Sequence, residues 1–344
     1  LVRRQADEDR LVADFQLVPS AVRLSAVNVE AQRAADSLAA GAGAIGEVLS
    51  RELLDRLGYQ GNEAAALALI TPGVTLLAGA DSSMSALSIG GQAPSQTGHL
   101  VDGMQAGAAS LPREAVKSTS VVTSAYDVSN GQYTGGFFEQ TTVSGTNAVK
   151  GTLTSSTPLA SIGDLSERTG VLSQRQTGFD GGGNISGPFK KDHLFGAFAA
   201  HGGRTSMPGA SVYTLNPATL GRLGLAPDSL DRFLQILDAQ GIARPTGSLA
   251  GPRISGNRQL FARIDFTPSE RHTFTLSGNE YKYWNGGAFD GPLSTPLAGA
   301  DYSTEAWRAL ASLTSHLGAW VNDARISGSK GNYGVTALFP AASG

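Results

Sequence analysis

Short apolar stretches, separated by glycine, proline, asparagine and serine, fill the first half of the chain and predict small helices and short strands. Apolar residues recur at helical spacing over residues 47–57, and Asn62 is a favourable cap for a second helix over residues 63–70. Shorter stretches predict strands at 74–77, 86–89, 99–101, 117–124, 136–143 and 149–155. Residues 47–160 are therefore predicted to form an α+β domain.

Longer alternating stretches begin near residue 178 and predict antiparallel strands joined in pairs. The pairs are 184–189 with 193–201, 257–267 with 272–284, and 305–317 with 319–329. Short turns join each pair, whereas the long segments 202–256 and 285–303 separate one pair from the next. Short turns that alternate with long loops are typical of a transmembrane β-barrel. The first long segment also contains a predicted helix at 229–240, capped by Asp228 or Ser229.

Side chains of opposite character alternate along these predicted strands, as expected when one face of a sheet is apolar. The apolar faces of three strands contain Leu260, Ala262, Ile264 and Phe266; Trp307, Ala309, Ala311 and Leu313; and Trp320, Ala324 and Ile326. The opposite faces contain Arg263 and Asp265; Arg308, Ser312 and Thr314; and Asp323 and Arg325. Trp307 and Trp320 are predicted near strand ends, where the aromatic girdles of a barrel lie. A soluble β-sandwich would show the same alternation, and the rhythm of the connections favours the barrel.

Composition narrows the classes of function. Charged residues make up 16% of the chain, fewer than the roughly 25% of an average soluble domain. The 26 basic and 29 acidic residues leave a net charge of −3, which gives no electrostatic basis for nucleic-acid binding. Because the chain has no cysteine, disulfides, thiolate metal sites and cysteine nucleophiles are excluded. No apolar run approaches the roughly 20 residues of a transmembrane helix.

Both ends of the sequence resemble internal positions of a longer protein. The chain begins at Leu1 with neither an initiator methionine nor an apolar segment like a signal peptide. It ends in a loop-like stretch over residues 339–344. We therefore expect the sequence to be an internal fragment.

Two short motifs match enzyme signatures without the context that those signatures need. Residues 41–46 match G-x-G-x-x-G, with Glu63 downstream, but no parallel-sheet pattern follows as a dinucleotide-binding fold requires. Ser327 and Lys330 match S-x-x-K, but the stretch is glycine-rich, non-helical and without partner motifs. The sequence therefore predicts no enzyme, and no catalytic residue, cofactor or metal site.

Isolated polar residues offer little chemistry of their own. No two histidines have the spacing of a metal-binding pair, so all five are predicted to be exposed or at turns: His99, His193, His201, His272 and His316. Asp102 could act as a lone functional carboxylate. Because Gly103 follows it, we instead expect the pair to form a tight turn.

An ordered set of phrases gives the chain its one family resemblance. These phrases are F-Q-L-V-P-S-A-V-R-L-S-A-V-N-V-E-A (15–31), V-L-S-R-E-L-L-D-R-L (48–57), A-L-A-L-I-T-P-G-V (66–74), L-V-D-G (100–103), L-P-R-E-A-V (111–116), G-Q-Y-T-G-G (131–136), S-G-T-N (144–147), F-K-K-D-H-L-F (189–195) and F-A-R-I-D-F-T-P-S-E-R-H (261–272). In this order they resemble the Oar-like group of TonB-dependent outer-membrane receptors. Members of that group have a carboxypeptidase-regulatory-like β domain before the transporter.

The resemblance implies a division of the chain into four parts. Residues 1–24 would end the carboxypeptidase-regulatory-like domain, and 25–46 would form the energy-coupling segment and linker. Residues 47–160 would form an α+β plug domain, with a plug turn at Asp102 and Gly103. Residues 161–344 would form the first antiparallel strands of a transmembrane β-barrel, incomplete, with long outer loops at 202–256 and 285–303.

The resemblance also implies a binding segment for the energy-coupling protein. The TonB-box candidate consists of Ser25, Ala26, Val27, Asn28, Val29 and Glu30, and it lacks the acidic start that is usual in the family. Such a segment adds as a strand to a TonB-type protein in the periplasm and depends on backbone hydrogen bonds.

The implied function is energy-coupled uptake of an unidentified extracellular ligand through the outer membrane of a Gram-negative bacterium. The implied partners are the coupling protein, outer-membrane lipid and that ligand, without nucleic acid. Tyr281, Tyr283 and Trp284 would contact the ligand or anchor in an aromatic girdle. Two alternatives stay open: an outer-membrane protein of the same build for secretion, adhesion or surface organisation, and a soluble all-β binding protein.

Overall fold

The computed structural model describes residues 45–50, 71–77, 87–107, 109–124, 136–157, 177–207, 220–221, 224–241, 253–288 and 300–337. By its internal contacts the chain divides into residues 1–39 and 40–344, and every described residue lies in the second unit. The predicted carboxypeptidase-regulatory-like segment, the TonB-box candidate and the predicted helix at 63–70 lie outside the described residues.

A five-stranded sheet forms the first part of the described structure. Its strands in spatial order are β1 (Ile45–Ser50), β6 (Val116–Ser124), β7 (Phe137–Thr142), β4 (Gly98–Val101) and β5 (Met104–Gln105). All neighbours are antiparallel except β4 and β7. A separate hairpin of β2 (Val74–Leu76) and β3 (Leu87–Ile89) packs against this sheet through a buried apolar cluster that contains Leu49, Val121 and Phe138.

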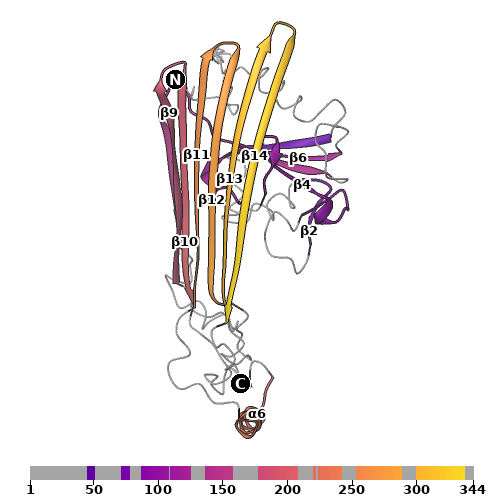
Figure 1. Ribbon diagram of the computed structural model, residues 1–344. Helices are drawn as coiled ribbons and strands as arrows, with labels where there is room; N and C mark the ends of the chain where they lie inside the picture. Colours follow the sequence, from indigo (N-terminus) through magenta and orange to yellow (C-terminus); the bar gives the residue numbers. More distant parts are fainter. Residues whose placement is uncertain are drawn as a thin grey trace, which may run out of the picture. The chain divides into compact units, whose positions relative to one another are not determined.

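Seven antiparallel strands form the second sheet, in which each strand pairs with the next along the chain (Figure 1). They are β8 (Lys150–Ser156), β9 (Thr177–Lys190), β10 (Leu194–Met207), β11 (Arg253–Ser269), β12 (His272–Ala288), β13 (Ala300–Leu317) and β14 (Trp320–Ala337). Short turns follow β9, β11 and β13, and Asp192 and Gly318 occupy two of them with positive φ. The predicted pairing of strands by short turns is confirmed.

These strands are longer than the alternation predicted. The strands β9 and β10 continue through Gly181–Gly183 and Gly202–Gly203, where glycine gives no polarity signal but the backbone ladder persists. The long connections consequently shorten to residues 208–252 and 289–299. Trp320 begins β14 as predicted, but Trp307 lies within β13 because that strand starts at Ala300.

Two predictions for the first half of the chain are wrong. Residues 45–50 form strand β1, although 47–57 was expected to begin a helix and 25–46 to be linker. Pairing with β6 and burial of Leu49 override the local helical spacing there. Strand β8, expected in the α+β domain that ends at 160, instead pairs with β9 at one edge of the seven-stranded sheet.

Helices are few among the described residues. Two short 3₁₀ helices, η2 (Pro94–Gln96) and η3 (Arg113–Ala115), lie in the first part, and α6 (Pro227–Ala239) lies in the connection between β10 and β11. The predicted helix at 229–240 is thus present, but Pro227 starts it and the cap residue is Ala226 rather than Asp228 or Ser229. None of the described helices combines the length and the apolar character needed to cross a membrane.

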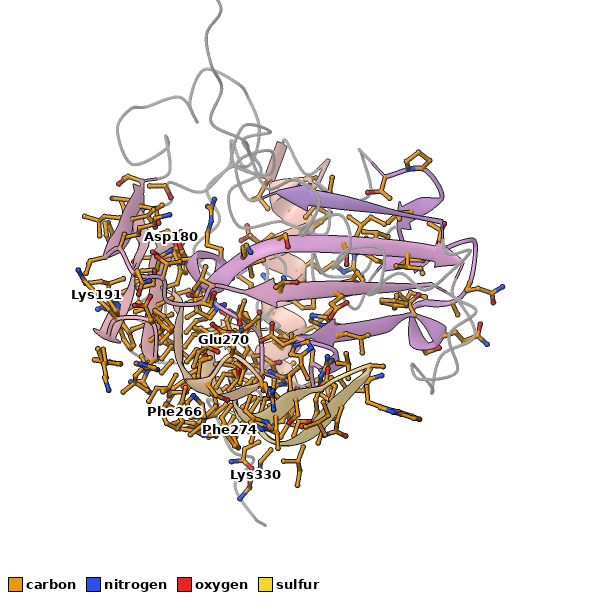
Figure 2. The ribbon with its side chains drawn as sticks, turned by 90° about the horizontal axis from the view of Figure 1, so that it is seen from above. Asp180, Lys191, Phe266, Glu270, Phe274 and Lys330 are labelled. Atoms are coloured by element: carbon orange, nitrogen blue, oxygen red, sulfur yellow. The ribbon has the colours of Figure 1, made fainter. Side chains whose placement is uncertain are left out.

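The two faces of the seven-stranded sheet differ in what they contact. The inner face, defined here as the face that contacts the five-stranded sheet, places Phe261 and Ala199 in a buried cluster with Val101, Leu111 and Val116. The outer face exposes apolar side chains, and Figure 2 shows Phe266 and Phe274 on it, with ring centroids 6.4 Å apart. The predicted alternation on β11, β13 and β14 is confirmed by the strand register.

Candidate functional site

A tight hairpin of the five-stranded sheet forms the centre of the contact with the inner face. Strands β4 and β5 pair Val101 with Met104, which leaves Asp102 and Gly103 as a two-residue turn. Both turn residues have positive φ, 49° and 76°, as a type I′ turn requires and as an Asp-Gly pair permits. This local geometry turns the Asp102 carboxylate toward β7 and β11.

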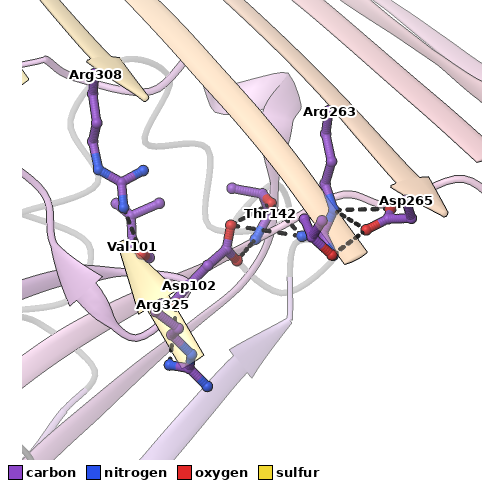
Figure 3. A network of polar contacts seen from close by, with 8 residues as sticks. Val101, Asp102, Thr142, Arg263, Asp265, Arg308 and Arg325 are labelled. Carbon is purple, nitrogen blue, oxygen red and sulfur yellow. Dashed lines mark hydrogen bonds and ion pairs between the residues drawn. The ribbon is translucent and has the colours of Figure 1, made fainter. Parts of the chain in front are cut away.

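Asp102 connects the two sheets through Thr142 and Arg263 (Figure 3). Thr142 of β7 donates from its backbone N–H to Oδ1 of Asp102 (2.9 Å) and from its hydroxyl to Oδ2 (2.7 Å). Arg263 of β11 donates from Nη1 to the Thr142 hydroxyl oxygen (2.9 Å), and Nη1 lies 3.6 Å from Oδ2 of Asp102. Asp265 orients the guanidinium, since it accepts from Nε at 2.9 and 3.0 Å.

Two further arginines hold the hairpin by its backbone. Arg308 of β13, 5% exposed, donates from Nη2 to the carbonyl oxygen of Val101 (2.8 Å) and from Nε to that of Gln105 (3.4 Å). Arg325 of β14 pairs with Asp323 and donates from Nη1 to the carbonyl oxygen of Asp102 (3.3 Å). Arg263, Arg308 and Arg325 therefore reach the hairpin from three strands, and we call them the arginine clamp.

A second polar contact lies at η3, where the Glu114 side chain is 1% exposed. Its Oε1 accepts a hydrogen bond from the hydroxyl of Thr154 in β8 (2.6 Å) and lies 3.1 Å from Nδ1 of His201 in β10. Asn184 of β9 donates to the Glu114 carbonyl oxygen (2.8 Å). Burial alone would raise the pKa of Glu114, but the hydrogen bonds of His201 and Thr154 outweigh it and hold that pKa below its ordinary value.

His201 lies between two carboxylates. Its Nε2 is 3.1 Å from Oδ2 of Asp180, while its Nδ1 faces Glu114. Each ring nitrogen thus faces an acceptor, an arrangement that satisfies a ring carrying both protons. The prediction that the histidines are exposed or at turns is wrong for His201, whose side chain is 10% exposed.

His99 is the second histidine that differs from the prediction, because it lies in β4 rather than at a turn or on the surface. Its ring stacks on Phe138 with centroids 4.2 Å apart, and Nε2 lies 3.1 Å from the amide oxygen of Gln140. Burial lowers the pKa of His99 to about 4, despite the hydrogen bond with Gln140, and the charge of Arg308 acts in the same direction as burial. His99 is therefore neutral near pH 7.

The aromatic residues singled out from the sequence divide between the two faces. The register places Tyr281 and Tyr283 opposite Gln259 and Asn257, on the inner face with Phe261 and Arg263. Trp284 pairs with Gly256 and lies on the outer face. Two more inner-face tyrosines, Tyr302 and Tyr333, stack edge-to-face beside Tyr283.

Most of these contacts could not be predicted from the sequence. Arg263 and Thr142 are 121 positions apart, and Arg308 and Val101 are 207 positions apart. Local patterns predicted which face each arginine occupies but not which group it binds. Among the described residues no set of three His, Asp or Glu side chains is arranged to hold a metal ion.

No protein-family model and no curated protein matches the sequence. Solved structures do match it. A variant of the ferric enterobactin receptor of Pseudomonas aeruginosa shares 12% identity at a TM-score of 0.55, over 84% of this chain and 40% of the receptor. The alcaligin outer-membrane receptor of Bordetella pertussis shares 14% identity at a TM-score of 0.54, over 87% of this chain and 41% of the receptor. The outer-membrane transporter YddB of Escherichia coli shares 13% identity at a TM-score of 0.55, over 83% of this chain and 38% of the transporter.

Because these sequence identities are low, the structural similarity establishes the fold alone. The chain has the fold of a portion of an outer-membrane receptor, and it spans about two fifths of the length of the proteins it matches. Those proteins are receptors and a transporter by their names. The described part of this chain consists mainly of an antiparallel sheet that holds a second, smaller sheet on one face.

Proposed function

We propose that this chain is the plug domain and the first barrel strands of a TonB-dependent outer-membrane receptor for energy-coupled uptake. One observation carries the proposal: the seven-stranded sheet is apolar on its outer face and grips the five-stranded sheet through buried polar groups on its inner face. In this assignment the five-stranded sheet belongs to the plug, and β8 to β14 belong to a barrel that further strands close.

The outer face supports a position in a membrane. Between the short turns and a row of charged residues, its exposed side chains are mostly apolar, among them Phe198, Ile264, Phe266, Leu276 and Trp307. The charged row crosses five neighbouring strands and consists of Arg204, Arg258, Glu280, Lys282, Glu305 and Lys330. Arg258 pairs with Glu280, and Lys282 with Glu305. Such a row fits the boundary between hydrocarbon and headgroups.

The depth of the apolar band agrees with a membrane. On β13 the band runs for eleven residues from Trp307 to Leu317, and on β14 for nine from Trp320 to Gly328. A tilted transmembrane strand needs about 9–11 residues to cross the hydrocarbon core. In outer-membrane barrels the short turns lie on the periplasmic side, so in this proposal the connections 208–252 and 289–299 would lie outside the cell.

The inner contacts support the role of a plug that is held and released. Hydrogen bonds from the arginine clamp to the hairpin are directional and can break and re-form without a change in covalent structure. The TonB-box candidate at 25–30 would transmit force from the periplasm to this sheet. The finer assignment to the Oar-like group, with residues 1–24 ending a carboxypeptidase-regulatory-like domain, rests on the resemblance of the sequence phrases.

The proposal is tested with the complete protein made in a Gram-negative host that has its own coupling protein. Cells are incubated in a mixed medium of small solutes, and the disappearance of each solute is followed by mass spectrometry. We expect at least one solute to be depleted about tenfold faster than by cells without the protein. Deletion of residues 25–30, or addition of a protonophore, should remove that difference, while the protein remains in the outer membrane.

The opposite outcome is equally specific. If no solute is depleted and the cells instead differ in attachment or in secreted protein, the same build serves adhesion or secretion. If the complete protein is absent from the outer-membrane fraction, the membrane assignment is wrong.

A further inference from the structure

Three tyrosines form a line across the inner face, in the half of the strands remote from the short turns. The rings of Tyr283 in β12 and Tyr302 in β13 meet edge-to-face with centroids 5.7 Å apart, and those of Tyr302 and Tyr333 in β14 are 4.8 Å apart. The register places Thr304 opposite both Tyr283 and Tyr333, so the rings lie at adjoining levels of three neighbouring strands. The charged row of the outer face lies at about the same level.

Neutral hydrogen-bonding groups surround these rings. Asn257 lies directly opposite Tyr283, and Gln259 lies opposite Tyr281. The hydroxyl of Thr304 donates to the phenol oxygen of Tyr302 (2.8 Å). We call the set of Asn257, Gln259, Tyr281, Tyr283, Tyr302 and Tyr333 the tyrosine face.

One group of this face lacks the partner that its burial requires. The side-chain oxygen of Asn257 is inaccessible to solvent, and it accepts no hydrogen bond from the described residues. A buried acceptor without a donor costs about 1–3 kcal/mol. A hydroxyl group of a ligand bound beside Tyr283 would supply that donor once the side chains that cover the oxygen move aside.

Charge is scarce on this part of the inner face. Among the described residues its charged side chains are Asp180, which pairs with His201, and Arg253, which has an interaction of its own. The basic side chains of Arg204, Lys282 and Lys330 belong to the outer face by register. The six residues of the tyrosine face are themselves uncharged.

We propose that the tyrosine face binds a neutral, polyhydroxylated ligand, namely an oligosaccharide. The inference rests on the proposed function, since it assigns the ligand class of that receptor. A sugar ring presents C–H groups that pack on aromatic rings, and its neighbouring hydroxyls pair with side-chain amides, which both donate and accept. An anionic metal chelate would need the cations that the tyrosine face does not offer.

The test measures binding to the complete receptor in detergent by titration calorimetry. The probes are maltohexaose, cellohexaose, xylohexaose and chitohexaose, with ferric tricatecholate and hexaalanine as comparison ligands. We expect at least one of the saccharides to bind with a Kd below about 1 mM. Tyr302→Ala should weaken that binding about tenfold, whereas Tyr302→Phe should retain most of it. Trp284→Ala, on the opposite face of β12, is the matched control and should change nothing.

Several outcomes overturn the inference. Binding of ferric tricatecholate or hexaalanine without any saccharide does so, as does the absence of binding by all four saccharides. Equal effects of Tyr302→Ala and Trp284→Ala also exclude the tyrosine face. Failure of the proposed function can be told apart from failure of this inference. Coupled uptake of a ligand that is not a saccharide would support transport and overturn the ligand class. Saccharide binding without coupled uptake would support the binding site and overturn transport.

Discussion

At the scale of single residues, Gly182 leaves the space that the Glu114 carboxyl group occupies. A Cβ atom at position 182 would lie 2.6 Å from the carbonyl oxygen of Ala200 and 2.7 Å from Cδ and Oε1 of Glu114. The close approach of η3 therefore explains why position 182 of β9 is a glycine. The sequence showed the glycines but not the carboxylate.

We expect Gly182→Ala to destabilise the complete protein by about 1–3 kcal/mol, the usual range for an overpacked site. Urea unfolding in lipid vesicles would measure the change. Gly328→Ala is the control, because a Cβ there has no neighbour within 4 Å. Equal stability of the two variants would show that Glu114 and η3 shift at no cost.

His99 should make stability depend on pH in a defined window. Its folded-state pKa of about 4 lies below the ordinary 6.5, so between these values the unfolded chain binds more protons than the folded chain. Stability should therefore fall on acidification from about pH 6.5 to 4, by up to about 1.4 kcal/mol per pH unit. Unfolding midpoints measured across that range for the complete protein and for His99→Gln test this.

The comparison with His99→Gln is needed because Glu139 acts in the opposite sense. Burial raises the pKa of Glu139, so its carboxyl group favours the folded state as pH falls. This contribution is present in both proteins and cancels in the difference. An identical pH slope for both proteins would exclude His99 as the cause.

At the scale of elements, the hairpin of β4 and β5 is held mainly by groups from other strands. It has two residue pairs of its own, which is too short a ladder for independent stability. Arg308 supplies hydrogen bonds to a carbonyl oxygen on each strand of the hairpin. The stability of this element therefore depends on the pairing of β4 with β7 and on the arginine clamp.

Arg308→Met should loosen the hairpin without unfolding the seven-stranded sheet. Loss of the donor leaves the carbonyl oxygen of Val101 without its partner, at a cost of about 1–3 kcal/mol. Hydrogen exchange of the amides in residues 98–105 should accelerate by roughly tenfold to a hundredfold. Arg258→Met on the outer face is the control, and exchange at residues 98–105 should stay unchanged in it. Unaltered exchange in Arg308→Met would remove Arg308 from the clamp.

Sequence patterns predicted some of the secondary-structure elements correctly and others wrongly. Alternation predicted the paired strands of the second sheet, because each strand has an apolar and a polar face and a turn residue at its end. The same reasoning failed for β1, because this strand pairs with the distant strand β6 and its Leu49 is buried among residues of β2, β3, β6 and β7. Helical spacing over so short a stretch is weaker than a partner strand, and no local signal reports that partner.

At the scale of the molecule, the outer face should respond to charge according to depth. Leu276 lies midway between the short turn at Glu270 and the charged row at Glu280, and it is 58% exposed. Leu276→Arg should cost about 2–4 kcal/mol in a bilayer, the range for a barrel midplane. Trp320→Arg, next to a turn, should cost about 0–1 kcal/mol for its charge. Folding free energies in lipid vesicles would measure both, and equal costs would contradict a membrane-facing surface.

The arrangement of two sheets was predictable from the sequence only through resemblance, whereas their contact was not predictable at all. Asp102 and Gly103 were correctly expected to make a turn, and Tyr281 and Tyr283 were expected near a ligand or a girdle. Their inner-face position, their neighbour Tyr302 and the partners of Asp102 all depend on register between distant strands. Register follows from turn length and strand ends, which glycine-rich stretches obscure in the sequence.

The order of strands in the five-stranded sheet has a mechanical consequence. β1, nearest to the chain's N-terminal side, lies at one edge, and the hairpin that ends in β5 lies at the other. Tension applied to the chain before residue 45 therefore loads the β1–β6 ladder first and reaches the arginines only after it has passed into β6 and β7. The two restraints act in series, so the weaker one yields first. A six-residue edge strand can detach and relieve the tension while the hairpin stays seated.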